Sequence, residues 1–310
     1  MSTPLNSYRR DIHRGPDMKT HAPSILSLVM LTVTLTAGCS TQDIAPNDPL
    51  LIGGSPVIDE TDFPATVGIS MKGKLCTGSK IGPRQILTAG HCVEDNHGKK
   101  LVPDGEDFGI FTYNVQSVPP DRTHSERRIR TEKIVTHPRF RSPNPGPDDI
   151  AIIFTAEDIS WIPEARLEFN TTEVGTPVTV AGYGCEEGRN IRPTTSPRLK
   201  SASAATVSPT EALEDLKQQP WFNLAERIWF RPKLKSETMH ILRGSAAGAT
   251  SSVCPGDSGG PLFLDKGNSK DPAIVGITSF SANGGGNFAR WSFFVRIDRH
   301  ATWIQKVMSD

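Results

Sequence analysis

Hydrophobic residues in this chain gather in short runs rather than in long helical repeats. Three runs of apolar or β-branched residues, bounded by Pro, Gly or Asp, are residues 150–154, 178–181 and 274–278. Short runs of this kind between turn-forming residues predict β-strands. The pattern therefore predicts a protein built mostly from short strands.

Few segments predict helices. One begins at residues 208–211 (SPTE), which have the form of a capping box with proline at the first helical position. Another closes the chain, with Asp298 as its expected N-cap. In that terminal helix apolar residues recur four positions apart, Trp303 with Val307 and Ile304 with Met308. A fold of alternating strands and helices would need more amphipathic helices than these.

The N-terminal region has the pattern of an export signal. Residues 25–38 form an apolar run of 14 residues after Lys19 and His21. Such a run is too short to span a bilayer and is typical of a signal-peptide core. Met18 is a better start for this signal than Met1.

A cysteine follows this run directly. Residues 35–38 (LTAG), before Cys39, resemble the lipobox of bacterial lipoproteins, in which the cysteine becomes the lipidated first residue; ordinary signal cleavage is the alternative. We therefore expect a signal region at 1–38, a lipidated tether or pro-segment at 39–50, and one domain at 51–310. The expected location is the bacterial cell envelope, or outside the cell after release.

Composition narrows the function classes. The 310 residues include 34 basic and 34 acidic side chains, which gives no sign of a nucleic-acid binder or of electrostatic membrane binding. The 27 glycines and 25 prolines are typical of a globular protein rich in loops.

One segment carries an obvious nucleophile. Residues 256–260 (GDSGG) match the G-x-S-x-G elbow of α/β-hydrolases and also the serine loop of a protease. An elbow enzyme would place its histidine after Ser258, where only His300 is available, inside the expected terminal helix. The scarcity of helices and the position of His300 both favour the protease interpretation.

Two segments upstream complete that interpretation. Residues 88–92 (TAGHC) and 147–153 (PDDIAII) resemble the histidine and aspartate motifs of the chymotrypsin family, and 256–261 (GDSGGP) resemble its serine motif. The order His, Asp, Ser is that of the family. The chain is thereby identified as a chymotrypsin/trypsin-like serine protease.

Further motifs extend the resemblance over residues 51–310. Residues 51–54 (LIGG) resemble the family's mature terminus, 181–184 (AGYG) the end of a strand, and 278–281 (TSFS) the substrate-binding strand. The resemblance implies an all-β fold of two antiparallel six-stranded barrels with a C-terminal helix. The active site is then expected in the cleft between the barrels.

The resemblance also assigns chemical roles. His91 would take the proton of the Ser258 hydroxyl and later give it to the leaving amine, while Asp149 would orient the imidazole. Asp148 is the competing aspartate, disfavoured because the family's residue directly precedes the apolar run. The backbone N–H groups of Gly256 and Ser258 would form the oxyanion hole. No metal or cofactor is expected, and the expected substrate is a protein or peptide.

The cysteines fit an exported protein. With Cys39 lipidated, four remain, and the residues alone leave three pairings open. The family's pair that closes the histidine loop matches Cys76 and Cys92. In the family, the cysteine that matches Cys254 usually pairs with one after the substrate-binding strand, but residues 281–290 contain no cysteine. We therefore expect a disulfide between Cys185 and Cys254.

Specificity is expected from three serines. Where trypsin-like members carry an aspartate at the base of the S1 pocket, this chain has Ser252. Ser281 replaces a glycine at the pocket wall, and Ser292 is expected to narrow the pocket further. Uncharged P1 residues of small or medium size are therefore the expected preference.

Activation in the family uses a freed N-terminus. The resemblance implies that cleavage between Leu50 and Leu51 frees an ammonium that pairs with Asp257. An activating protease is then an expected partner, and the cut would also release the domain from a lipid anchor.

Residues 218–235 form an insertion with apolar aromatic residues among basic ones. A surface insertion with its own small core is the favoured interpretation, and an exosite for a partner or substrate is the alternative. The alternative function for the whole chain is a catalytically silent binding module, if Leu51 is never freed.

Overall fold

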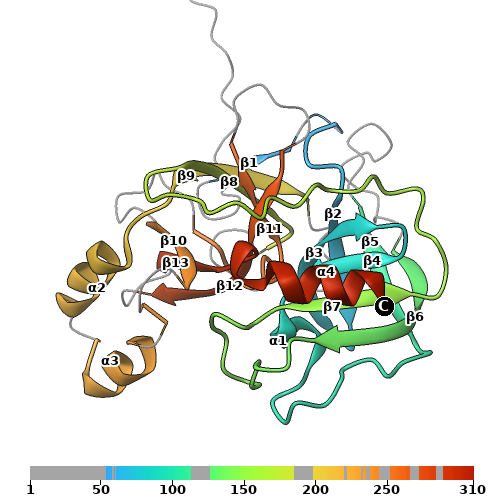
Figure 1. The fold of residues 1–310 in the computed structure, drawn as a ribbon, viewed down its shortest axis with the longest axis horizontal. Coiled ribbons are helices and arrows are strands. Elements are labelled where there is room, and N and C mark those ends of the chain that lie inside the picture. The colour runs from blue at the N-terminus through green and yellow to red at the C-terminus, as the bar shows by residue number, and fades with distance from the viewer. Residues whose placement is uncertain are drawn as a thin grey trace, which may run out of the picture. The chain divides into compact units, whose positions relative to one another are not determined.

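The computed structural model describes residues 54–57, 59, 61–112, 126–184, 198–219, 222–231, 233–234, 238–243, 252–265, 272–283 and 289–310. The chain divides into two compact units, Met1–Ile44 and Ala45–Asp310, and every described residue belongs to the second. Figure 1 labels the helices and strands of this unit. Within the described ranges, no helix is both long and apolar enough to cross a membrane.

Six strands close into the first barrel. Their order is β2-β3-β4-β7-β6-β5, and neighbouring strands are antiparallel. Every residue of β7 is buried, as its apolar sequence requires. The strands are β2 (Thr66–Met71), β3 (Lys74–Gly82), β4 (Gln85–Thr88), β5 (Asp107–Phe111), β6 (Arg127–Thr136) and β7 (Ala151–Thr155).

The second barrel contains β8 (Pro177–Gly182), β9 (Lys200–Ala205), β10 (Met239–Arg243), β11 (Pro261–Leu264), β12 (Ile274–Asn283) and β13 (Ala289–Arg296). They follow the order β9-β8-β11-β12-β13-β10, and the short β1 (Ser55–Pro56) adds a further strand beside β9. A bridge between Thr206 and Leu242 joins the two ends of this order. The predicted pair of antiparallel six-stranded barrels is confirmed.

Few helices accompany the barrels, as predicted. The helical segments are α1 (Gly90–Val93), α2 (Pro209–Lys217), α3 (Leu224–Phe230), the 3-10 turn η1 (Asp298–His300) and α4 (Ala301–Ser309). α2 begins where the capping sequence predicts, and the Ser208 hydroxyl accepts a hydrogen bond from the N–H of Glu211 at 3.1 Å. The C-terminal helix is confirmed, and the ring of Trp303 lies 5.1 Å from that of His137 in the first barrel.

The prediction that Asp298 caps the terminal helix is wrong. Asp298 starts the 3-10 turn, and its carboxylate accepts hydrogen bonds from the guanidinium of Arg296 at 2.7 and 3.0 Å. α4 itself follows His300. The carboxylate of Asp298 is therefore bound to Arg296, two residues upstream, and does not cap the N-terminus of α4.

The insertion at 218–235 does not have a core of its own. Phe222 and Phe230 belong to the same hydrophobic cluster as Phe293 of β13, and the rings of Phe230 and Phe293 lie 5.7 Å apart. Figure 1 shows α2 and α3 together on one flank of the second barrel. Because Phe222 and Phe230 pack in the same cluster as Phe293 of the second barrel, the insertion extends the barrel core.

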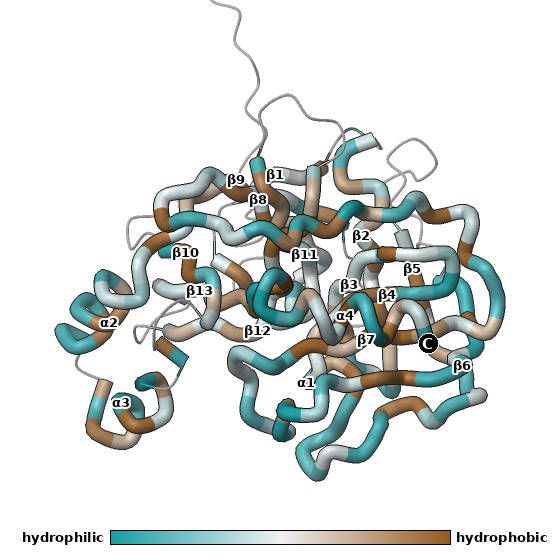
Figure 2. The backbone as a smooth tube through the Cα atoms, in the orientation of Figure 1, coloured by the Kyte–Doolittle hydropathy of each residue, from teal (hydrophilic) through white to brown (hydrophobic). Residues whose placement is uncertain are grey.

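In Figure 2 hydrophobic stretches are concentrated on the strands, and the outer loops of the first barrel are largely hydrophilic.

Candidate active site

A buried carboxylate orients His91. The Nδ1 atom of His91 lies 2.7 Å from Oδ2 of Asp149, and the backbone N–H of His91 donates to Oδ1 at 2.8 Å. Asp149 is fully buried, and the hydroxyl of Ser279 donates to its Oδ2 at 2.6 Å. Because a carboxylate only accepts hydrogen bonds, Nδ1 carries the proton and Nε2 keeps its lone pair. His91 is therefore in the tautomer whose Nε2 atom can accept a proton.

The position of His91 is fixed by the elements around it. α1 follows β4 directly, and Cys92 of this helix forms a disulfide with Cys76 of β3, the pair implied by the resemblance. A side chain at Gly90 would meet the ring of Phe140 at 2.8 Å, so only glycine fits there. Lys74 donates a hydrogen bond to the backbone carbonyl of His91. Several independent contacts therefore hold the imidazole in place.

The serine loop has the backbone of a tight turn. Gly256 and Gly259 both have positive φ, +103° and +80°, and a Cβ at Gly259 would lie 2.1 Å from Oγ1 of Thr88. Among the described residues, no acceptor takes the N–H of Gly256 or Ser258. These two donors are therefore available to an oxyanion.

Thr77 of β3 ties this loop to the first barrel. Its N–H donates to the carbonyl of Ser258 at 2.8 Å, and its hydroxyl donates to the carbonyl of Gly256 at 2.8 Å. The same hydroxyl accepts from the N–H of Tyr183 at 3.0 Å. Sequence reasoning missed Thr77, because its partners are distant in the chain. The only local signal is its position next to Cys76.

One pocket joins the candidate residues. It has a volume of about 350 Å³ and is lined by His91 and Ser258, together with Lys74, Glu94, Asn96, Ser142, Pro143, Pro145, Val253, Cys254, Pro255, Thr278, Ser279, Phe280 and Ser281. The residues come from both barrels. Ser258 and His91 therefore face the same space.

The three predicted pocket serines cluster. Ser281 of β12 pairs in register with Ser292 of β13, and Ser281 lines the pocket. The hydroxyls of Ser292 and Ser252 lie 3.4 Å apart, and Ser292 accepts from the N–H of Val253 at 3.2 Å. Both Ser252 and Ser292 are buried. Of the three predicted serines, Ser281 lines the pocket, whereas Ser252 and Ser292 are not part of its lining.

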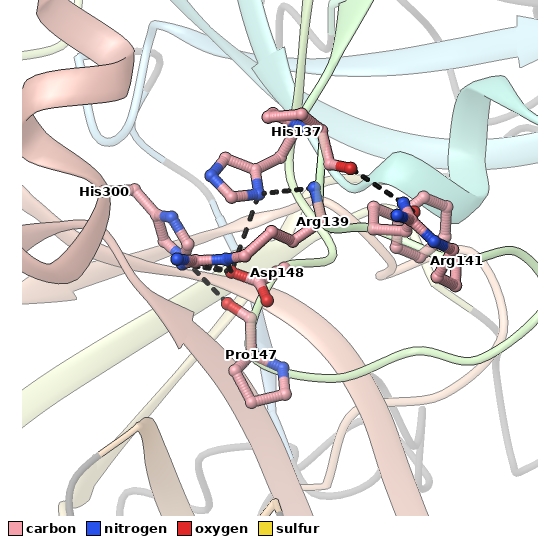
Figure 3. A network of polar contacts seen from close by, with 8 residues as sticks. His137, Arg139, Arg141, Pro147, Asp148 and His300 are labelled. Carbon is pink, nitrogen blue, oxygen red and sulfur yellow. Dashed lines mark hydrogen bonds and ion pairs between the residues drawn. The ribbon is translucent and has the colours of Figure 1, made fainter.

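Asp148 belongs to a different network, shown in Figure 3. Its carboxylate accepts from the guanidinium of Arg139 at 2.8 and 3.1 Å and lies 3.5 Å from Nδ1 of His137. His300 donates its Nε2 proton to the carbonyl of Pro147 at 2.7 Å. Burial, followed by the charge of His300, lowers the pKa of His137 to about 4. Asp149, not Asp148, therefore faces His91.

The same network has the ligand spacing of a metal site. The ligand atoms of His137, Asp148 and His300 lie within 4.8 Å of one another. However, Arg139 already neutralises Asp148, and Nε2 of His300 is committed to Pro147. The second group with this spacing contains Cys76 and Cys92, whose sulfurs form the disulfide. Neither group fits a metal ion.

A second buried carboxylate lies next to the nucleophile. Asp257 accepts hydrogen bonds from the N–H of Gly184 at 2.7 Å and of Cys254 at 2.9 Å. Burial raises the pKa of Asp257 to about 6, although these N–H groups and the charge of Lys200 lower it. Its expected partner Leu51 lies outside the described residues.

Other expected residues fall partly outside the described ranges. Cys254 is disulfide-bonded, but Cys185, its expected partner, lies outside them, as does Cys39.

An aromatic cluster from the insertion borders the pocket. The ring of Trp229 lies 5.2 Å from that of Phe280, which lines the pocket. The ammonium of Lys233 lies 2.7 Å from the centroid of the Trp229 ring, and burial lowers the pKa of Lys233 to about 7. The apolar residues of the insertion signalled packing, but the sequence did not indicate which strand they would contact.

Comparisons with known proteins agree with this geometry. The sequence profile of the Trypsin family matches residues 51–304. The chain is 25% identical over 300 residues to chymotrypsin-like elastase family member 1 of Bos taurus, an alignment that covers 92% of this chain and 99% of the relative. It is 26% identical over 241 residues to kallikrein-8 of Mus musculus, covering 76% and 78% of the two chains.

The fold has a counterpart among solved structures. Neuropsin, described as a serine protease expressed in the limbic system of mouse brain, superposes with a TM-score of 0.57 at 24% identity. The match covers 82% of this chain and 98% of neuropsin. At this identity the likeness concerns the fold alone. The match of the family profile over most of the chain is decisive: the protein belongs to the trypsin family.

Proposed function

We propose that this protein is a serine endopeptidase in which Ser258 is the nucleophile, His91 the general base and Asp149 the residue that orients the base. One observation carries the proposal. The buried carboxylate of Asp149 accepts both the ring N–H and the backbone N–H of His91, which directs the other ring nitrogen to the pocket that Ser258 lines. Membership of the trypsin family supports the same chemistry.

The reaction follows from these positions. Nε2 of His91 takes the proton of the Ser258 hydroxyl as the oxygen attacks the scissile carbonyl carbon. The N–H groups of Gly256 and Ser258 stabilise the oxyanion, and a single such donor contributes about 3 to 4 kcal/mol. His91 then gives its proton to the leaving amine, and an acyl-enzyme remains on Ser258. Water, deprotonated by His91, hydrolyses the ester and restores the hydroxyl.

The proposed P1 preference is an uncharged side chain of small or medium size. The serine pair Ser252 and Ser292 supports it, because buried hydroxyls give an arginine no counter-charge. A panel of peptide anilides differing only at P1 tests the preference. We expect Ala, Val or Leu to exceed Arg in kcat/KM, and Ser252→Asp to gain cleavage after Arg. Strong cleavage after Arg by the unaltered enzyme would contradict this assignment.

We also propose that the protein is exported and that Cys39 carries a lipid anchor. The support is the apolar run at 25–38 and the small residues before Cys39. Cys39→Ser expressed in a bacterial host should move the protein from the membrane fraction to the soluble exported fraction. An unchanged distribution would show that the signal is cleaved in the ordinary way.

Labelling of the serine tests the proposed function. A fluorophosphonate probe should modify the mature protein at one serine, and Ser258→Ala should abolish the labelling. Ser309→Ala is the matched control, since Ser309 is an exposed serine at the end of α4, outside the pocket, and its substitution should leave the labelling unchanged. Absence of labelling in every form of the chain would favour a binding module.

A further inference from the structure

A buried lysine of the insertion lies next to one wall of the pocket. Lys233 is 8% exposed, and its ammonium lies 2.7 Å from the ring centroid of Trp229 and 5.3 Å from that of Phe280. Phe280 lines the pocket that His91 and Ser258 also line. The insertion therefore places a cation against a residue of the candidate active site.

This ammonium contacts aromatic rings rather than a counter-ion. Nζ of Lys233 has no hydrogen-bond partner among the described residues. Burial lowers the pKa of Lys233 to about 7, although the charges of Asp149 and Glu226 act in the opposite direction. A buried cation without a bound counter-ion is energetically unfavourable, and an anion that comes near it reduces that cost. The charge of Lys233 therefore favours a negative group in the neighbouring pocket.

Contacts on two sides hold Lys233 in this position. Its backbone N–H donates to the carbonyl of Phe230 at 2.9 Å. A Cβ at Gly146, in a loop of the first barrel, would lie 3.3 Å from Cε of Lys233. Pro145 of the same loop lines the pocket, as Phe280 of β12 does. The lysine thus contacts parts of both barrels that contribute to the pocket, and its charge has a fixed place relative to them.

The attraction across the Phe280 ring is large enough to affect specificity. Two groups in contact lie about 4 Å apart, so a carboxylate that contacts this ring lies at most about 9 Å from Nζ of Lys233. With an effective dielectric constant of about 20, a charge pair at that distance changes an equilibrium constant by about 20-fold. Salt reduces this factor, and we expect about 10-fold at low ionic strength.

We propose that Lys233 makes the pocket selective for an acidic side chain close to P1, so that peptides with Glu or Asp there are cleaved in preference to their amide counterparts. Lys233 is a specificity-determining residue that acts through its charge at the Phe280 wall and takes no part in the bond-making steps. The inference rests on the proposed function of Ser258, because it names a substrate class for the same site.

Paired peptides test the inference. Donor–quencher peptides with alanine at P1 carry either Glu or Gln at one position from P4 to P2′, P1 excepted, and are compared at pH 6, where the ammonium of Lys233 is largely charged. We expect the Glu peptide to exceed its Gln partner about 10-fold in kcat/KM at one or more positions. Lys233→Met should decrease this ratio to below about 2, and Lys233→Arg should keep most of it.

The ratio within each variant is the quantity to compare, because a general loss of activity cancels from it. Lys74 and Glu94 line the pocket with opposite charges, so the change on substitution of Lys233 isolates its own contribution. Lys217→Met is the matched control, since Lys217 pairs with Glu214 on the surface of α2 and should leave the ratio at its wild-type value. A ratio near 1 in the wild type at every position, or a ratio that Lys233→Met leaves unchanged, would overturn the inference while the proposed function stands.

A binding measurement separates the inference from catalysis. Ser258→Ala removes the proposed nucleophile, and calorimetry at pH 6 gives the Kd of each peptide for this variant. We expect the Glu peptide to bind about 10-fold more tightly than the Gln peptide, and the double variant Ser258→Ala, Lys233→Met to bind both equally. Equal binding of the two peptides by Ser258→Ala would overturn the inference. A Glu preference in binding by a protein that hydrolyses none of the peptides would support the inference and overturn the proposed function.

Discussion

Two buried carboxylates flank the candidate nucleophile, and their surroundings differ. Asp149 accepts from groups that line the pocket, namely the ring of His91 and the hydroxyl of Ser279. Asp257 accepts hydrogen bonds from two backbone N–H groups, those of Gly184 and Cys254. The first carboxylate meets a group that can gain and lose a proton, and the second meets a rigid backbone.

The difference indicates that Asp149 and Asp257 have different roles in the reaction. A carboxylate next to an imidazole stabilises the imidazolium that forms during the reaction. A carboxylate held by backbone N–H groups changes little during the reaction and instead sets the geometry of the loop.

Of the substitutions considered, Asp149→Asn should decrease activity the most. The amide leaves the geometry nearly unchanged but favours the wrong tautomer of His91, and the loss in kcat is expected to be about 10⁴-fold. Steady-state kinetics on a peptide ester would measure it. A loss below about 10-fold would mean that Asp149 does not orient the base.

The second prediction concerns the pH dependence of stability at Asp257. Its folded-state pKa of about 6 is above the ordinary aspartate pKa of 3.8, so the wild type loses stability relative to Asp257→Asn as pH rises from about 4 to about 6. The total change is about 3 kcal/mol, or about 100-fold in the unfolding equilibrium constant.

Urea unfolding of both proteins from pH 3.5 to 7.5 would measure that difference. Buried histidines such as His137 and His240 titrate in both proteins, so their effects cancel. A difference that stays flat over this range would show that the carboxylate of Asp257 is not destabilised by burial.

Thr77→Val is expected to have the next largest effect on stability and activity. The substitution removes the hydroxyl that donates to Gly256 and accepts from Tyr183, which leaves a buried carbonyl and a buried N–H without that partner. We expect a loss of about 2 kcal/mol in unfolding free energy and about a 10-fold decrease in kcat. Thr77→Ser keeps the hydroxyl and should retain most of the unfolding free energy and most of the kcat of the wild type. Equal behaviour of the two variants would exclude the hydroxyl as the cause.

Asp148→Asn should have the smallest effect on activity. Asp148 pairs with Arg139, whose side chain is largely exposed, and exposed ion pairs contribute at most about 1 kcal/mol. We expect kcat/KM within about 3-fold of the wild type. A loss approaching that of Asp149→Asn would reverse the assignment of the two neighbouring aspartates.

Sequence reasoning found the residues whose signals are local. The strand runs, the capping sequence at Ser208 and the order of the His91, Asp149 and Ser258 motifs can all be read from neighbouring residues. Asp298 was predicted wrongly as a cap because the choice of Arg296 as its partner depends on side-chain geometry.

Contacts across the fold could not be predicted in this way. Thr77 and Gly256 are separated by 179 positions, and nothing near Thr77 marks it as a support of the serine loop. The insertion at 218–235 likewise joins the barrel core through Phe230 and Phe293, which belong to separate elements.

The rate of fluorophosphonate modification of Ser258 tests the central claim most directly. Mass spectrometry of the labelled mature protein should find a single adduct on Ser258, with the rate decreased by orders of magnitude in His91→Ala and Asp149→Asn. An adduct on another serine, or a rate that neither substitution changes, would contradict the assignment of these three residues as the catalytic triad.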